Sequence, residues 1–509
     1  ASPSSRSKHS TTRPAKEPGG INPIHWISHM KKRLTIIFVI ALVIVNVACG
    51  VSYQKLMEKP EAMFYQGQFK EAARELYKEH GSVGSKDEML ILMECGLMLN
   101  AAQDYPNSTK VLMKAGKMAD KINISISREA AGLLLDQTMT NYKGEDFERV
   151  LIHMYLGINF LFMKKPNEAR IEFKKVNDVL KDIKVSSSGK TYRQNVMAMY
   201  LSAIAFEMSA DLEDSEKEKF GDWQTAYVSY KQIAELEPRL PMLPTDLQRL
   251  AKFIGDNEDY RKWVGRYGRR DNLPKDAGEF IMIYQAGRSA IKVSRGPLLS
   301  DQTFNVGLNV ALRSASLAGG LTAVAVMAAL NKAENPIPKW QRRANNISHM
   351  VINVNGVDLG RTVMLNNIED TAIQTFDDTE YPALVKKTIA GMVVKLGASA
   401  AGGFAVKHLT KFILKQAGLG SIADAGGNLA GVAAGAGIMT GLIASLKPDL
   451  RCWHTLPANL QLSRLFLPAG NYNIKIKFID KYGRIERFTE HQVQIGKGQK
   501  TFFNFRTLY

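Results

Sequence analysis

The sequence predicts an α+β protein with an N-terminal α-solenoid, a central mixed region containing Ala/Gly-rich helices, and a small antiparallel β-sandwich at the C-terminus. Three patterns support this prediction. Apolar residues recur at helical spacing through residues 51–265. Two later tracts, 308–333 and 381–446, are rich in Ala and Gly, and residues 449–509 alternate apolar and polar residues between turn signals. We therefore divide the chain into residues 1–29, 30–48, 49–265, 266–448 and 449–509.

Residues 30–50 have the layout of a secretory signal peptide: three cations, an apolar run from Leu34 to Val47, and then Ala48-Cys49-Gly50. The run is about 15 residues, short of the roughly 20 that span a bilayer, so cleavage is favoured over a single span. The ending resembles the bacterial lipobox, and we expect Cys49 to be lipidated. Asn46 stands where an aliphatic residue is usual, so a plain secretory signal and an uncleaved anchor remain as alternatives. Residues 1–29 are predicted to be disordered or to precede the true start at Met30.

Composition indicates an anionic neighbour. The formal net charge is +18 for the chain and about +12 for residues 49–509, which favours nucleic acid, acidic lipid headgroups or cell-wall polymers. An exported protein rarely meets nucleic acid, so we expect an envelope surface instead. Three cysteines cannot form a disulfide scaffold. Cys95 lies in an apolar helical pattern and Cys452 in another predicted domain, so we do not expect them to pair.

The helical half contains internal repeats. In residues 150–179, Leu156, Gly157 and Phe160 are followed by Ala169 and Phe173, intervals that match the tetratricopeptide (TPR) pattern. Further positions that fit this pattern are Gly67, Phe69, Ala72, Gly221, Trp223, Ala226, Tyr230 and Pro238. We predict stacked helix pairs whose concave face holds a protein partner; the alternative is an irregular helical bundle. A last helix is expected over residues 246–267.

The central region predicts two hairpins in a mixed sheet. One is expected over residues 279–293 around Gln285-Ala286-Gly287. The other, over residues 349–359, has Asn355-Gly356, the favoured type I′ turn. The Gly-rich tract 381–446 is best interpreted as a packed helical hairpin, with membrane insertion and phosphate binding as alternatives.

No catalytic, metal or cofactor motif is recognisable, so we predict a non-enzyme that needs no cofactor. Cys452 and His454 are two residues apart and would point the same way on a strand, but a structural role is favoured. In the C-terminal module, Pro468-Ala469-Gly470 opens a strand. That turn resembles those of PEGA-like, carbohydrate-associated β modules.

Together these parts resemble a family of bacterial envelope lipoproteins with N-terminal TPR-like repeats. The resemblance rests on Cys49, the repeats, GEFIMIYQAG (278–287) and a tail motif. The tail positions are Asp449, Arg451, Trp453, Leu456, Pro457, Pro468, Gly470 and Tyr472. The resemblance to this family implies a location in the envelope and a scaffold role, but no activity.

These observations predict a non-catalytic lipoprotein that is anchored to a membrane, with the outer membrane favoured over the inner one, and that faces the periplasm. We expect it to act as a TPR scaffold in envelope assembly or maintenance. Its expected partners are an envelope protein, the membrane through lipid on Cys49, and peptidoglycan. Two alternatives are a glycan-binding lipoprotein that uses the β module and a membrane-remodelling component that uses residues 381–446. An enzyme is the least favoured.

Overall fold

The computed structural model describes residues 52–79, 85–129, 141–186, 195–314, 330–400 and 447–509. All belong to one compact unit, Ser52–Tyr509, which is distinct from Ala1–Val51. The predicted signal peptide, Cys49 and most of the Gly-rich tract lie outside the described residues. Within the described part, no helix combines the length and apolar character needed to cross a membrane.

The first half of the unit is a stack of antiparallel helices in which neighbours along the chain pack against each other. The bounds are α2 Tyr53–Tyr65, α3 Phe69–Glu79, α4 Glu88–Ala101, α5 Tyr105–Glu129, α6 Asp146–Phe162, α7 Pro166–Ser186, α8 Val196–Ala210, α9 Glu216–Leu236, α10 Leu243–Phe253 and α11 Asn257–Tyr267. We call α2, α4, α6, α8 and α10 the inner helices and α3, α5, α7, α9 and α11 the outer helices. The predicted α+β class and its N-terminal TPR-like solenoid are confirmed.

Small residues allow the helices of a pair to approach closely, as the repeat pattern predicts. A Cβ on Gly157 would lie 2.5 Å from the Phe173 ring, and one on Gly96 would lie 2.4 Å from Leu112. Gly67 has φ +81° in the turn between α2 and α3, a conformation that glycine adopts at little cost. The other predicted repeat positions are buried or partly buried, namely Phe69, Ala72, Leu156, Phe160, Ala169, Trp223, Ala226 and Tyr230.

Two helical details differ from the sequence prediction. Residues 246–267 form two helices rather than one, because Gly255 adopts φ +74° after α10 and reverses the chain. Gly221, which precedes Trp223 in the predicted repeat, has open space around its Cβ position and so serves no close approach. Pro238 lies just beyond the end of α9, as predicted.

The second half contributes two four-stranded sheets. The first has the order β10-β1-β7-β6 and the second β5-β4-β8-β9. Their bounds are β1 Ala277–Ala286, β4 Ile347–Val354, β5 Val357–Arg361, β6 Val363–Asn367, β7 Asn459–Pro468, β8 Gly470–Asp480, β9 Ile485–Ile495 and β10 Lys500–Arg506. β1 pairs parallel to β10 and antiparallel to β7, so the first sheet is mixed. The short strands β2 Ile291–Val293 and β3 Lys339–Gln341 pair with each other.

The strands of residues 459–506 do not form a sandwich by themselves. β7 and β10 flank β1, and β8 pairs with β4, so central and C-terminal strands interleave in both sheets. The hairpin predicted over residues 279–293 is wrong: β1 runs through Gln285 to Ala286 and β2 pairs elsewhere. The hairpin at Asn355-Gly356 is confirmed, with φ +48° and +90° at the two turn residues.

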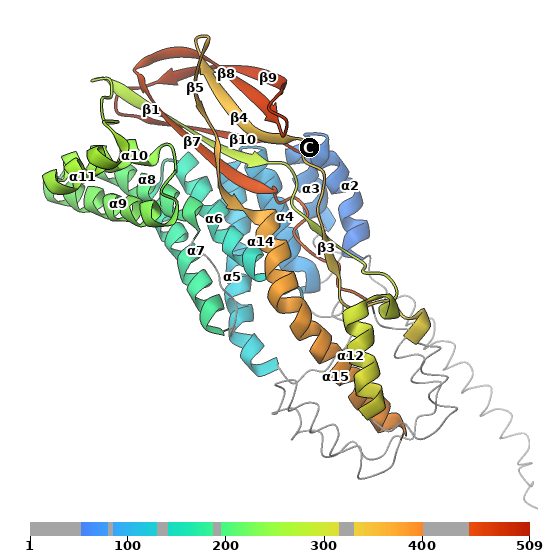
Figure 1. Ribbon diagram of the computed structural model, residues 1–509. Coiled ribbons are helices and arrows are strands. Elements are labelled where there is room, and N and C mark those ends of the chain that lie inside the picture. Colours follow the sequence, from blue (N-terminus) through green and yellow to red (C-terminus); the bar gives the residue numbers. More distant parts are fainter. Residues whose placement is uncertain (1–51, 80–84, 130–140, 187–194, 315–329, 401–446) are drawn as a thin grey trace, which may run out of the picture. The chain divides into compact units, whose positions relative to one another are not determined.

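The unit is built in three layers, with the inner helices on one face of the first sheet and the second sheet on its other face (Figure 1). Alternate residues of β1 serve the two cores. Ile281 and Ile283 join the helical core, whereas Phe280, Met282 and Tyr284 pack against Ile476 and other residues of the second sheet. Because both faces of β1 are covered, its apolar run is continuous, which is typical of a central strand.

A smaller core joins most of the remaining helices, while Ile368 and Ala372 of the helix over residues 368–375 belong to the helical core instead. These elements lie in the connections between strands. They are α12 Gln302–Ser314, α14 Ile368–Thr375, a π-helical turn over Phe376–Glu380 and α15 Tyr381–Ala400. Leu298, Phe304, Phe376 and Ile389 are among the buried residues that hold α12 against α15. α15 is the described beginning of the Gly-rich tract.

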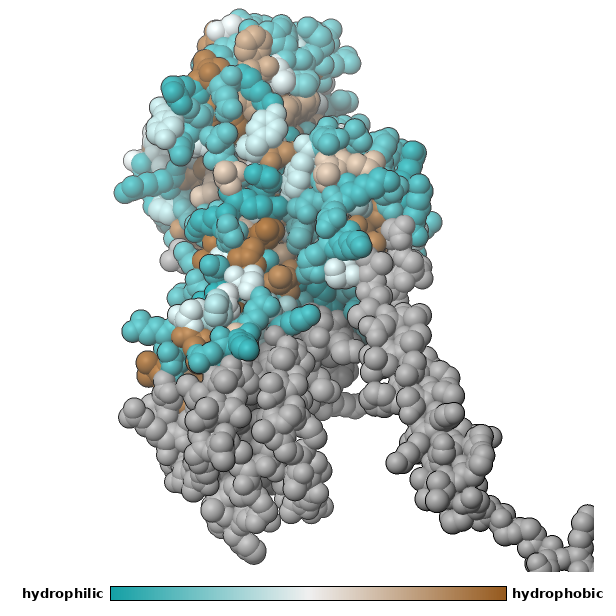
Figure 2. Space-filling view, turned by 90° about the vertical axis from the view of Figure 1, so that its right-hand side faces the viewer, coloured by the Kyte–Doolittle hydropathy of each residue, from teal (hydrophilic) through white to brown (hydrophobic). Residues whose placement is uncertain are grey.

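Figure 2 shows one face of the molecule, on which the described surface is mainly hydrophilic and apolar residues form small separate groups. Single exposed apolar residues are normal on a folded protein. The described part of this face therefore carries no large apolar patch that would indicate a docking site.

Candidate functional site

The most elaborate polar arrangement lies where the inner helices meet residues 449–458, which we call the tail segment. This segment precedes β7 and contains most of the predicted tail motif. Its residues from Arg451 to Ala458 are all buried. We call its contact with the inner helices the seam.

Glu94 of α4 is the central acceptor of the seam. Its Oε1 accepts hydrogen bonds from the Tyr53 hydroxyl (2.7 Å) and the His454 amide (2.5 Å), and its Oε2 accepts from the Thr455 amide (3.1 Å) and hydroxyl (2.5 Å). Burial raises the pKa of Glu94, while the charge of His454 and these donors oppose that rise. One buried carboxylate thus holds two consecutive amides of the tail segment.

Glu148 of α6 repeats this arrangement one helix pair further on. Its Oε1 accepts from the Trp453 amide at 2.7 Å, while its Oε2 accepts from the Glu145 amide at 2.9 Å and from the Tyr142 hydroxyl. Burial and the neighbouring Glu145 charge raise the pKa of Glu148 to about 7. Two successive inner helices, α4 and α6, therefore each present an acidic side chain to the backbone of the tail segment.

Arg451 fixes the beginning of the tail segment. Its guanidinium donates to both Asp449 carboxylate oxygens, at 2.9 and 2.7 Å, and to Asp87 before α4 at 2.7 Å. Although burial opposes ionisation of Asp449, the hydrogen bonds and charge of Arg451 hold the pKa of that carboxyl below its usual value. Two-pronged contacts of this kind are strong and directional.

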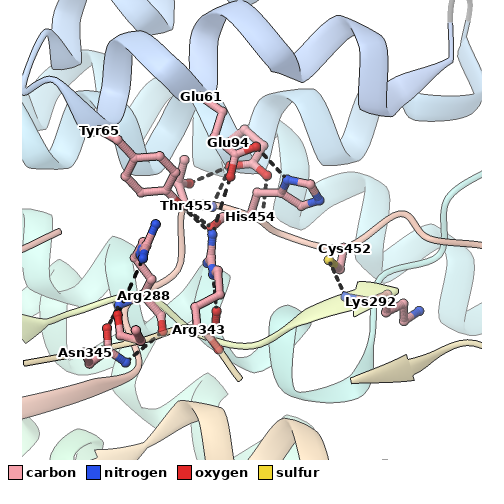
Figure 3. Close-up of polar contacts among 12 residues, drawn as sticks. Glu61, Tyr65, Glu94, Arg288, Lys292, Arg343, Asn345, Cys452, His454 and Thr455 are labelled. Carbon is pink, nitrogen blue, oxygen red and sulfur yellow. Dashed lines mark hydrogen bonds and ion pairs between the residues drawn. The ribbon is translucent and has the colours of Figure 1, made fainter. Parts of the chain in front are cut away.

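The other side of the tail segment is held by residues from α2 and from the loop after β3 (Figure 3). Arg343 donates to the His454 carbonyl (2.6 Å), to the Ser289 carbonyl (2.6 Å) and to the Tyr65 hydroxyl (2.5 Å). The His454 ring meets Glu61 at 3.0 Å between Nδ1 and Oε2. Burial disfavours charge on this ring, but Cys452 and Glu61 together raise its pKa well above the usual value.

Cys452 and His454 do not form an exposed nucleophile–base pair. Cys452 is fully buried and its Sγ accepts from the Lys292 amide at 3.5 Å (Figure 3). His454 is only 9% exposed. Cys95 and Cys452 are both free thiols, consistent with the expectation that they do not pair. We interpret both residues of the tail segment as structural.

A second polar cluster locks the sheet to the end of the stack. Arg464 of β7 is fully buried and donates to Asp246 (3.0 Å), Glu207 (2.9 Å) and Glu279 (2.8 Å), which come from α10, α8 and β1. Burial raises the pKa of Asp246 to about 6, whereas Arg249, Arg464 and Lys500 outweigh burial and lower that of Glu207. A buried charge set of this kind is tolerable because each carboxylate has a cationic partner.

The rest of the predicted tail motif has backbone or packing roles. Trp453 and Leu456 are buried in the helical core, and the Pro457 position is buried. Gly470 begins β8, and the Tyr472 hydroxyl donates to the Pro468 carbonyl at 2.8 Å. The motif therefore comprises two separate parts: the tail segment under the helices and the turn that leads into the second sheet.

The sequence prediction missed the partners of the tail segment. Glu94 interrupts an apolar helical run and Arg464 lies in a strand of mainly apolar residues, whereas Glu148 lies in the charged stretch 145–149 and gives no such signal. Charged residues are almost never fully buried unless they are paired, so these interruptions were the available signal. What they could not indicate was which distant residue each one meets.

Among the described residues, no group of three or more His, Cys, Asp or Glu side chains could hold a metal ion. The seam is a closed intramolecular interface in which buried carboxylates accept hydrogen bonds from backbone amides of the tail segment, which turns at His454-Thr455. The inner helices, which the repeat pattern designates as a partner surface, are covered by this chain's own tail segment and first sheet.

Comparison with known proteins adds little. No protein-family model and no curated protein matches the chain. Among solved structures, a protein described as a kinesin light chain of Podosopora anserina with nearly identical TPR-like repeats aligns with a TM-score of 0.28 at 13% identity. The alignment covers 42% of this chain and 92% of that one. A similarity at this level carries no argument here.

Proposed function

We propose that this chain is a non-catalytic lipoprotein scaffold of the bacterial cell envelope, tethered through Cys49 and facing the periplasm. The observation that carries the scaffold role is the stack of helix pairs whose inner face is already occupied by the tail segment. A stack closed in this way offers its outer helices to other proteins. The signal layout of residues 30–50 and the tail motif support the location.

The outer helices are suited to contact because they expose apolar side chains among charged ones. Met113 of α5 and Ile171 of α7 are 45% and 54% exposed. Neither belongs to the cores that hold the stack together. Such positions can bind a partner without disturbing the fold, whereas the concave face that solenoids ordinarily use is covered here by the tail segment and the first sheet.

A photo-crosslinking amino acid placed at Ile171 or Met113 in growing cells tests the partner surface. We expect crosslinks from these positions to an envelope protein. A matched probe at Phe488 of β9, which is 55% exposed on the second sheet, should give few. Crosslinks from Phe488 alone would contradict a role for the helical stack.

The tether is tested separately by Cys49→Ala, membrane fractionation and mass spectrometry of the mature N-terminus. Lipidation predicts a diacylglycerol on Cys49 and loss of residues 1–48. The variant should remain unprocessed. A mature protein that begins elsewhere, or an unmodified Cys49, would remove the lipid tether from the proposal.

A further inference from the structure

The end of the helical stack carries an unusual surface charge. α11 packs only against α10 among the helices it contacts extensively, so it is the last helix of the stack. Its buried side chain is Trp263. The exposed cations of α11 and the following loop are Arg261, Lys262, Arg266, Arg269, Arg270 and Lys275. We call these residues the basic cap.

Exposed cations outnumber exposed carboxylates here: Glu258 and Asp276 are exposed, and Asp276 pairs with Lys497, whereas Asp259 and Asp271 are turned inward. The Asp271 side chain is 3% exposed, accepts from the Tyr260 hydroxyl at 3.1 and 3.2 Å and lies 3.4 Å from Nε of Arg269, whose side chain is 70% exposed. Asp259 is 19% exposed and its contact with Lys262, which is 63% exposed, is a long 3.9 Å. The carboxylates hold the loop and helix together while the cations face water.

Aromatic rings lie close to two of these six cations, Lys262 and Arg266. The Arg266 guanidinium lies 5.1 Å from the Tyr267 ring centroid, and the Lys262 ammonium lies 4.9 Å from that of Trp263. Cation–π contacts of this type restrict a side chain without neutralising its charge. Arg261 and Gly265 are four apart on α11, and the Cβ position of Gly265 has open space around it, whereas Arg269 lies beyond the helix, which ends at Tyr267 before Gly268 at φ +71°. The cap is therefore an ordered, outward-facing cationic surface.

We propose that the basic cap binds the anionic phospholipid surface of a bilayer. A terminal repeat needs a polar outer face for solubility. Side chains of mixed charge meet that need, so solubility alone does not explain an excess of cations. Three cations lie along about 7.5 Å of α11, at 1.5 Å per residue, and three more follow in the loop, so the cap can contact several headgroups at once. The choice of a bilayer rests on the proposed tether, which would keep the whole chain at a membrane.

The size of the effect follows from the number of cations. Each Lys or Arg close to an anionic membrane strengthens binding about fivefold at moderate ionic strength. Neutralising four of them should therefore weaken binding about a hundredfold or more. Because the attraction is screened beyond roughly 10 Å at 0.1 M salt, added salt should weaken it as well.

The test measures binding of the full chain carrying Cys49→Ala to vesicles, with Arg261, Arg266, Arg269 and Arg270 all changed to Gln. Vesicles of phosphatidylcholine, with and without about 30 mol% phosphatidylglycerol, separate anionic attraction from insertion of the apolar segment. The readout is the ratio of binding to the two vesicle types. We expect a clear anionic preference that the fourfold cap variant loses.

A matched control removes the same charge elsewhere. α5 exposes four lysines on one side at positions 110, 114, 117 and 121, and changing them to Gln should leave the preference within about threefold. The proposal is overturned if both variants lose the anionic preference equally, because binding then follows net charge. It is also overturned if the cap variant keeps the wild-type preference. The same holds if the protein shows no preference for anionic vesicles, or if it binds only a soluble polyanion such as heparin. None of these results affects the Cys49 lipidation test, so the tether is judged independently.

Discussion

Replacing Glu94 by Gln should open the seam locally. The carboxylate accepts four hydrogen bonds, two at each oxygen, and the side chain has no exposed surface. An amide keeps one oxygen acceptor but places a donor against the partners of the other. If that donor faces Thr455, the hydroxyl can rotate to accept, whereas the Thr455 amide cannot.

The expected cost follows from that loss. A hydrogen bond to a charged group contributes about 1.5–3 kcal/mol, and a buried donor left unpaired costs about 1–3 kcal/mol. We therefore expect Glu94→Gln to destabilise the seam by about 2–4 kcal/mol. Because a factor of ten corresponds to about 1.4 kcal/mol, opening of the tail segment should become roughly 30 to 1,000 times more frequent.

Hydrogen–deuterium exchange of peptides covering residues 449–458 measures this opening directly. The control is Glu58→Gln, an exposed mid-helix glutamate of α2, which should leave exchange of the tail segment unchanged. The reasoning is refuted if Glu94→Gln exchanges its tail segment at the wild-type rate, because then the four contacts do not hold the segment in place.

Three further outcomes are expected. Gly157→Ala should lower the free energy of unfolding by about 1–3 kcal/mol because its Cβ would lie 2.5 Å from the Phe173 ring. Gly221→Ala, in open space on α9, should raise the free energy of unfolding by up to about 1 kcal/mol. Thermal melting of the two variants checks both signs. Arg464→Met should cost about 3–5 kcal/mol by leaving buried carboxylates without their cation, seen as a lower melting temperature, and a wild-type melting temperature would contradict the assigned pairing. The pKa of Glu148 is raised to about 7 in the fold, so the folded state binds more protons than the unfolded state between about pH 4.5 and 7. The contribution of Glu148 to the unfolding free energy therefore falls as pH rises through that range and is constant above it. Glu148→Gln should flatten this part of the pH–melting profile, and an unchanged slope would argue against a raised pKa.

Local chemistry made the helical half predictable. The spacing of Gly157, Ala169 and Phe173 reports contacts between two helices that are adjacent in sequence, and the structure places these residues at that contact. The Asn355-Gly356 hairpin was predictable for the same reason, since both strands and the turn lie within a few residues. In contrast, Gln285-Ala286-Gly287 looked like a turn, yet β1 continues to Ala286 because β7 and β10 cover both of its edges.

The candidate site was only half visible in the sequence. Arg451 and Trp453 belong to the predicted tail motif, but their partners Asp87 and Glu148 lie 364 and 305 residues earlier in the chain. No periodicity connects residues so far apart. The burial of Glu94 could have been suspected from its apolar helix, but its four donors could not have been named.

By itself, the sequence determined the elements whose contacts are local: the helix pairs, the Asn355-Gly356 turn, the alternating C-terminal strands and the excess of positive charge. The tertiary structure alone decided how the two halves combine. It placed C-terminal strands on both sides of β1 and threaded the tail segment beneath the inner helices. The physical reason is that long-range strand pairing and burial of a paired charge depend on which surfaces meet, and that information is absent from the spacing of neighbouring residues.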